Sequence, residues 1–154
     1  MNFKGFKPID WTIVATGVLS FIALFLPWWG VSFEGYGASV NGWNTSYGWF
    51  GALLVVGAAA WYVLARAGVG AARLEGTQAA GTAGVTILGF VIVLIRWITL
   101  PRGNAYGRAF HYGGRAGIWI AAIAAAVQVA AMVVLFRQSG EPMPWKSWRS
   151  RGSA

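Results

Sequence analysis

Residues 117–136 read GIWIAAIAAAVQVAAMVVLF, an apolar stretch without a single charged side chain. A helix needs about 20 such residues to cross the hydrocarbon core of a bilayer. Three further apolar stretches of comparable length precede it, at 11–29, 49–65 and 82–100. The four stretches together predict an all-α integral membrane protein, a four-helix transmembrane bundle that forms a single domain over residues 1–154.

The composition supports this prediction and narrows the possible chemistry. Hydrophobic residues make up 57% of the chain and charged residues only 10%, against about 25% charged residues in an average soluble domain. The chain contains no cysteine, which excludes disulfides, thiolate metal sites and a cysteine nucleophile. A length of 154 residues suits one compact bundle without a second domain.

The basic residues predict how the bundle is oriented. Short loops rich in Lys and Arg stay on the cytoplasmic side of a membrane. The first loop has no basic residue and the third has three, whereas the two tails and the second loop share eight: Lys4, Lys7, Arg66, Arg73, Arg137, Lys146, Arg149 and Arg151. We therefore expect both termini in the cytoplasm, with residues 137–154 forming a basic cytoplasmic tail.

The ends of the first stretch carry local signals. Asp10 precedes it and is a reasonable N-cap, and Pro27 is expected to kink or end the helix because it cannot donate a backbone hydrogen bond. Trp28 and Trp29 then fall at headgroup depth, where tryptophan is enriched. We interpret both as interface anchors, with stacking on a ligand as the alternative; the same applies to Trp11, Trp49, Trp97 and Trp119.

The first loop, residues 30–48, predicts a short β-hairpin on the membrane surface. Val31 and Phe33 alternate with polar neighbours, a Gly-Tyr-Gly turn follows at 35–37, and the alternation resumes at 39–41. A lone two-stranded hairpin is marginally stable in water. We therefore expect the helix ends or another protein to cover it.

Few polar side chains fall inside the predicted spans. Arg96 lies one turn before the end of the third span, where it can snorkel to the interface or pair with Glu34, the only acidic residue expected on the outer side. Gln128 lies near the middle of the fourth span and is expected to bond another helix, with a transport site as the alternative. Ala122, Ala126 and Ala130 form a small-residue stripe, with Ala121 and Ala125 on an adjoining one, for packing within the bundle or for self-association.

The third loop places Arg102, Arg108 and Arg115 among aromatic residues. This mixture suits anionic lipid headgroups or an acidic partner surface; nucleic acid is not expected, because the loop is predicted to lie outside the cytoplasm. His111 is the only histidine and makes no metal site by itself. We find no catalytic residue set and expect neither an enzyme nor a cofactor. Because all four acidic residues fall outside the predicted spans, proton-coupled transport is not expected either.

Several motifs resemble those of a group of small four-pass membrane proteins from actinobacteria. They are Phe-Leu-Pro-Trp-Trp at 25–29, Asn-Gly-Trp at 41–43, Arg-Trp-x-Thr-Leu-Pro at 96–101, and Tyr-Gly-x-Arg at 112–115 leading into the helix with Gln128. The resemblance implies a four-helix architecture in a bacterial plasma membrane and carries no known activity. The first loop is also similar in layout to claudin-like bundles, without the disulfide that those carry.

The leading functional expectation is a non-enzymatic accessory subunit that docks onto a larger complex in the plasma membrane. The alternatives are a homo-oligomeric, holin-like pore and a lipid-binding protein that holds a headgroup with Arg96 and Arg115. The residues expected to contact lipids or partner subunits are Arg96, Arg102, Arg108, Arg115, Glu34, Gln128, Trp28, Trp29 and Trp43.

Overall fold

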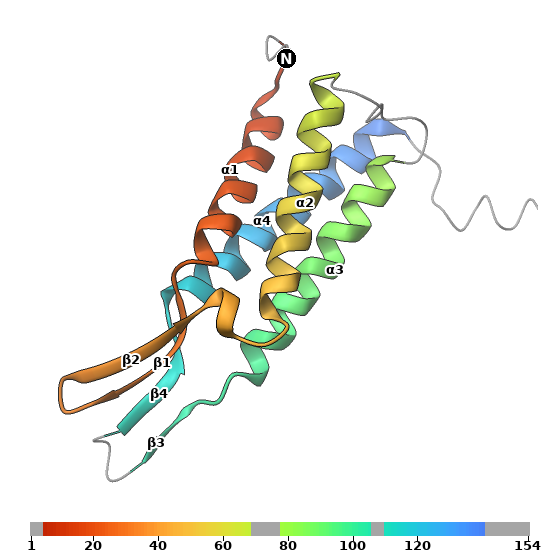
Figure 1. Cartoon of the computed structure of the whole chain (residues 1–154). Helices are drawn as coiled ribbons and strands as arrows, with labels where there is room; N and C mark the ends of the chain where they lie inside the picture. The colour runs from red at the N-terminus through yellow and green to blue at the C-terminus, as the bar shows by residue number, and fades with distance from the viewer. Residues whose placement is uncertain (1–4, 69–77, 106–109, 141–154) are drawn as a thin grey trace, which may run out of the picture.

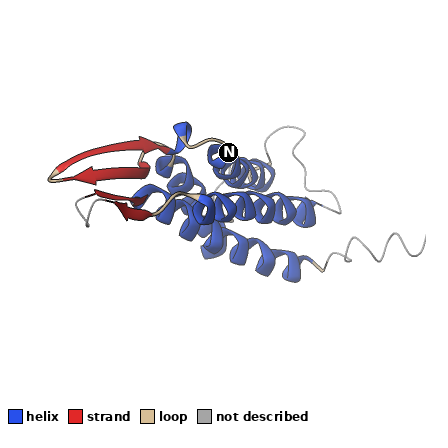
Figure 2. Ribbon diagram, turned by 90° about the horizontal axis from the view of Figure 1, so that it is seen from below, coloured by secondary structure: helices blue, strands red, loops and turns tan. Residues whose placement is uncertain are grey.

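The computed structural model describes residues 5–68, 78–105 and 110–140. Four helices lie side by side as a bundle, and four strands form a small sheet that projects from one end of it (Figures 1 and 2). The start of the first helix and the end of the last lie together at the opposite end (Figure 1). We call these two ends the sheet end and the terminal end.

Three of the helices are long and apolar enough to cross a membrane. They are α2 (Gly48–Arg66), α3 (Gln78–Thr99) and α4 (Ala116–Ser139), and they confirm the stretches predicted at 49–65, 82–100 and 117–136 to within about one helical turn. Helix α4 has 24 residues and is therefore about 36 Å long. The chain is thus a multi-pass membrane protein.

Helix α1 is shorter than predicted. It covers Pro8–Ala23, 16 residues, so the predicted span 11–29 is confirmed at its start to within one helical turn and was wrong at its far end. Lys7 is the N-cap, with Pro8 at the first helical position, where its missing N–H removes no hydrogen bond. Asp10 is therefore not the N-cap; it lies inside the first turn, and its carboxylate accepts a bond from the Lys7 backbone N–H at 2.7 Å.

The last residues of the predicted first span are a strand. The sheet contains β1 (Pro27–Phe33), β2 (Tyr36–Asn41), β3 (Gly103–Ala105) and β4 (Phe110–Gly114), all antiparallel in the order β2-β1-β4-β3. The expected hairpin is confirmed as β1 and β2. It is not isolated, because β1 also pairs with β4 from the third loop.

The turn of the hairpin differs in detail from the expectation. It consists of Glu34 and Gly35, with φ of 43° and 87°, rather than the Gly-Tyr-Gly sequence at 35–37. Positive φ at both central residues is the requirement of a two-residue type I′ turn, whose twist matches that of the strands. Gly35 adopts this conformation without steric cost, and Glu34 is thereby placed at the far tip of the sheet.

Trp28 connects the sheet to the bundle. Its side chain is completely buried, and its indole N–H donates to the Ala23 carbonyl oxygen at 2.7 Å. A Cβ at Gly42, Gly48 or Gly117 would lie only 2.7–2.8 Å from atoms of this ring. The prediction of an interface anchor was therefore wrong for Trp28: three glycines clear a space in which the ring becomes the core of the junction.

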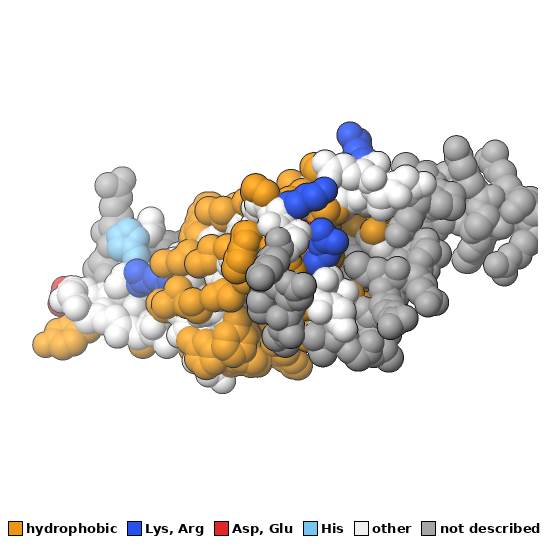
Figure 3. Space-filling view, turned by 90° about the horizontal axis from the view of Figure 1, so that it is seen from above, with side chains coloured by type: hydrophobic (Ala, Val, Ile, Leu, Met, Phe, Trp, Pro, Cys, Tyr) orange, Lys and Arg blue, Asp and Glu red, His pale blue; other side chains and the backbone are white. Residues whose placement is uncertain are grey.

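Small residues fill the interior of the bundle, but not all those expected. Ala121, Ala122 and Ala125 are buried, whereas Ala126 and Ala130 are exposed. Only Ala122 of the predicted stripe packs inside, since the buried face of α4 is rotated toward Ala121 and Ala125. Figure 3 shows hydrophobic side chains gathered over the helical part of the surface, as expected for contact with lipid.

Replacing Trp28 with alanine is expected to destabilise the protein by about 3–5 kcal/mol, the usual cost of emptying a buried aromatic site. Thermal unfolding in a mild detergent, followed by far-UV circular dichroism, measures the effect. Trp11→Ala is the matched control, because Trp11 is 53% exposed. Equal shifts in melting temperature for the two variants would contradict the assignment of Trp28 as the core of the junction.

Candidate functional site

The outer edge of the sheet offers unpaired backbone. Strand β2 pairs with β1 on one side, and no strand of the described residues lies on the other. Residues 36–40 are all exposed, and Tyr36 is 83% exposed. The strand carries neither charge nor proline, the two devices that most often protect a sheet edge from pairing with another chain.

A cleft of about 250 Å³ lies where the sheet meets the end of α3. Trp29, Asn44, Thr45, Arg96 and Pro101 are among the residues that line it. The Arg96 Nε is buried and has no hydrogen-bond partner. The guanidinium carbon lies 5.8 Å from the centroid of the Tyr47 ring, within the range of a cation–π contact.

The expected pair between Arg96 and Glu34 is not formed. Glu34 lies at the tip of the sheet, whereas Arg96 lies in the last turn of α3. Within residues 5–68, 78–105 and 110–140, the single ion pair joins Arg66 to Asp10. Arg96 has no carboxylate partner among these residues, so its side chain presents an uncompensated positive charge to the cleft.

Arg102 and Arg115, the other described arginines of the sheet end, do not line the cleft at Arg96. Arg102 donates to the Trp97 carbonyl oxygen at 2.6 Å and lies over the Trp97 ring, so it caps the end of α3. Arg115 is the N-cap of α4, and its backbone N–H donates to the Trp28 carbonyl oxygen at 2.9 Å. The Arg115 side chain lines other cavities than Arg96, so the two do not share one headgroup site. Arg108 lies outside the described residues.

The remaining tryptophans expected to contact partners are partly exposed. Trp29 is half-buried, and its indole N–H donates to the Pro101 carbonyl oxygen at 2.9 Å. This bond ties β1 to the segment that follows α3. Trp43 is 37% exposed and stacks on Trp49 with ring centroids 6.4 Å apart. Trp43 and Trp49 therefore form an aromatic surface at the sheet end.

Gln128 bonds two neighbouring helices. Its side chain is completely buried, its amide N–H donates to the Val55 carbonyl oxygen of α2 at 2.8 Å, and its amide oxygen accepts from the Thr16 hydroxyl of α1 at 3.0 Å. Both ends of the amide are satisfied within the bundle. The expectation of a helix-to-helix bond is confirmed.

A polar cluster at the terminal end was missed by the sequence reasoning. Asp10 is only 1% exposed and accepts hydrogen bonds from the Tyr62 hydroxyl and from the backbone N–H of Lys7. Arg66 approaches the same carboxylate at 3.7 Å and donates to the Gly5 carbonyl oxygen. Asp10 thus lies in the first turn of α1, outside the three helices that are long enough to cross a membrane. The signal was present: the predicted topology puts Asp10 and Arg66 on one side of the membrane.

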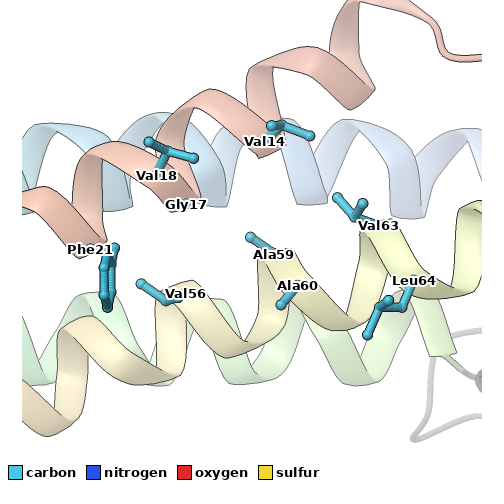
Figure 4. A pocket seen from close by; sticks show the side chains of 9 residues that line it. All are labelled: Val14, Gly17, Val18, Phe21, Val56, Ala59, Ala60, Val63 and Leu64. Atoms are coloured by element: carbon cyan, nitrogen blue, oxygen red, sulfur yellow. The ribbon is translucent and has the colours of Figure 1, made fainter. Parts of the chain in front are cut away.

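A second cavity, of about 420 Å³, opens between α1 and α2. Figure 4 shows the side chains around it, and they are apolar throughout. At its floor the two helices approach so closely that a Cβ at Gly17 would lie 2.7 Å from that of Ala59. A lining of this kind has the chemistry of a surface that faces acyl chains.

Replacing Tyr62 with phenylalanine is expected to destabilise the protein by about 1–3 kcal/mol, because the buried Asp10 carboxylate loses a donor without gaining water. Thermal unfolding in detergent tests this expectation. Tyr47→Phe is the matched control, since the Tyr47 hydroxyl bonds Thr99 at an exposed position. A larger loss for Tyr47→Phe than for Tyr62→Phe would show that the cluster does not hold α1 to α2.

Comparison with known proteins adds no further identification. No protein family model, no curated protein and no solved structure matches the chain. The similarity to four-pass actinobacterial proteins therefore stays a prediction. The protein is thus a membrane protein with several apolar helices and a four-stranded sheet at one end of them.

Proposed function

We propose that this protein is a non-enzymatic accessory subunit of a larger complex in a bacterial plasma membrane, and that the sheet is its docking surface. The observation that carries the proposal is the open edge of β2, which is exposed, uncharged and free of proline. The occupant that fits this edge is an extended strand from the extracytoplasmic part of another membrane subunit. Such a strand adds its main-chain hydrogen bonds to the sheet and gains specificity from side-chain contacts.

The register of the hairpin identifies the backbone groups that a partner would use. In an antiparallel ladder, every second residue of an edge strand turns its N–H and C=O away from the neighbouring strand. Counting from the Phe33–Tyr36 pair that closes the turn, these residues are Gly37 and Ser39. The N–H and C=O groups of Ala38, between them, point toward β1 and pair with Val31 within the hairpin.

The proposed orientation follows from charge and from the position of the termini. The start of α1 and the end of α4 lie together at the terminal end of the bundle (Figure 1). In the sequence, the tails and the second loop that adjoin this end contribute eight Lys and Arg residues. With this end in the cytoplasm, the sheet faces the outside. Helix α1, although short, runs beside α2 and α4 and would provide the fourth crossing.

A homo-oligomeric pore is less consistent with the surface of the bundle. A pore needs a polar stripe on the face where copies meet. Among the described residues, Thr16, Thr86 and Gln128 are buried and bonded within the bundle. The large side chains that face outward along the helices are apolar, for example Leu19, Leu88 and Ile123.

The absence of cysteine makes the orientation directly testable. Ser39→Cys, on β2, is expected to react with a membrane-impermeant maleimide in intact cells, whereas Gln138→Cys, at the end of α4, is expected to react only after permeabilisation. The unmodified chain has no cysteine and serves as the blank. The reverse labelling pattern would place the sheet in the cytoplasm and contradict the proposed topology.

Ser39→Pro tests docking at the β2 edge, because it removes an outward N–H at a position where an edge strand tolerates proline. We expect the variant to keep its melting temperature and to lose the partner that co-purifies in mild detergent. A photo-crosslinking residue in place of Tyr36 should capture that same partner, and one in place of the lipid-facing Ile123 should not.

Ala38→Pro is the control for the fold, since it removes an N–H that faces β1 and is expected to lower the melting temperature. Two results would overturn the docking proposal. One is a Ser39→Pro variant that is folded and still retains the partner. The other is a crosslink from position 36 only to a second copy of this chain, which would favour homo-oligomerisation instead.

A further inference from the structure

We propose that the cleft around Arg96 binds a phosphate group, presented by the headgroup of an anionic membrane lipid. The inference starts from the state of the Arg96 side chain. Its guanidinium makes no ion pair and no hydrogen bond with any residue in the described part of the chain, and its Nε is shielded from solvent. An Nε–H that is shielded from water and has no acceptor is unfavourable, so this half-buried guanidinium has hydrogen-bonding capacity that the described part of the chain does not use.

Other polar side chains buried in the bundle show that this state is unusual for the molecule. Asp10, Gln128 and Thr86 each bond to other groups of the chain. Among the described residues, buried side-chain polar atoms without a partner occur only at Ser20 and Arg96. Of the two, only Arg96 carries a charge and lines a cleft.

The position of the side chain is not that of simple snorkelling into water. The Arg96 stem packs so closely on the start of α2 that a Cβ at Gly48 would lie 2.8 Å from Arg96 Cγ. The guanidinium is held over the Tyr47 ring at 5.8 Å. The planar group is therefore oriented before any ligand arrives, which reduces the entropy lost when it binds phosphate through two parallel hydrogen bonds.

The charge of the cleft lining favours an anion. Trp29, Asn44 and Thr45 donate to oxygens of the chain itself, so Arg96 supplies the free donors, and the lining contains no carboxylate. The volume of about 250 Å³ accommodates a phosphate group with several waters, since each water occupies about 30 Å³. Arg96 thus faces a space of suitable size in which it is the sole charged group.

The depth of the cleft favours a lipid as the source of that phosphate. Arg96 lies in the last turn of the membrane-length helix α3. Aromatic side chains surround this level: Trp97 contacts Trp119 with ring centroids 4.6 Å apart, and Trp43 stacks on Trp49. Tryptophan and tyrosine concentrate where the hydrocarbon core meets the headgroups, so the cleft opens at the level of lipid phosphates.

The test is a thermal-shift titration of the delipidated full-length protein in detergent. Short-chain phosphatidylglycerol is expected to raise the melting temperature, whereas diacylglycerol, which lacks phosphate, is not. The apparent affinity for phosphatidylglycerol should fall about tenfold or more in Arg96→Gln, as expected for the loss of hydrogen bonds to a charged group. Arg102→Gln is the matched control and should respond like the unmodified protein, because Arg102 is bonded to the Trp97 carbonyl oxygen.

A second variant keeps the proposal falsifiable if Arg96→Gln does not fold. Asn44→Asp places a carboxylate in the lining of the cleft with almost no change in shape. The variant loses the bond from Asn44 to the Asn41 side-chain oxygen, and it is expected to abolish the response to phosphatidylglycerol because its carboxylate competes for Arg96. A folded Arg96→Gln or Asn44→Asp protein with an unchanged response would overturn the proposal, and so would an equal response to diacylglycerol. An equal, Arg96-dependent response to inorganic phosphate would overturn the lipid source and assign the cleft to soluble phosphate.

Discussion

The burial of Trp28 against the backbone of three glycines is the contact on which the arrangement of sheet and bundle depends. Gly42 belongs to the segment after β2, Gly48 begins α2 and Gly117 lies in the first turn of α4. Any side chain at these positions would collide with the ring. Backbone bonds on either side reinforce the junction: the Gly42 N–H donates to the Leu24 carbonyl oxygen, and the Arg115 N–H donates to that of Trp28, each at 2.9 Å. One aromatic side chain thus fixes the ends of α1, α2 and α4 relative to the sheet.

The bundle below this junction satisfies most of its buried polar side chains, with the Ser20 hydroxyl as the exception among the described residues. In lipid, an unsatisfied donor or acceptor has no water to bond, and Gln128 meets this constraint by bonding both α1 and α2. Asp10 meets it at the terminal end through Tyr62, Arg66 and the Lys7 backbone. The helices therefore turn apolar surfaces outward and retain little polar capacity for a solute. Polar contacts with other molecules are therefore expected outside the membrane-spanning helices.

How much of this was predictable differs from element to element. Helices α2, α3 and α4 follow from the length of their apolar stretches, and the β1–β2 hairpin follows from the alternation around Val31 and Phe33. The end of α1 follows only in part. Pro27 was expected to kink or end the helix, and β1 begins there, but residues 24–29 are as apolar as the helix before them, and an apolar run alone does not distinguish a buried strand from a helix. The pairing of β1 with β4 joins residues about 80 positions apart, and two glycines end β4, so no local pattern reveals it. The cleft at Arg96 depends on that long-range pairing and was equally hidden.

The two ends of the molecule differ in what they leave unpaired. At the terminal end, Asp10 and Arg66 form an ion pair, while Arg137 at the end of α4 is exposed and can be solvated by water. At the sheet end, Arg96 and Arg115 lie without a carboxylate partner in the described residues, Glu34 stands apart at the tip, and β2 has one edge that no described strand pairs with. Arg96 differs from Arg137 because its Nε is shielded from solvent without an acceptor. An anionic group near Arg96 would supply acceptors for its guanidinium, and a strand along β2 would pair with the backbone N–H and C=O groups of that edge.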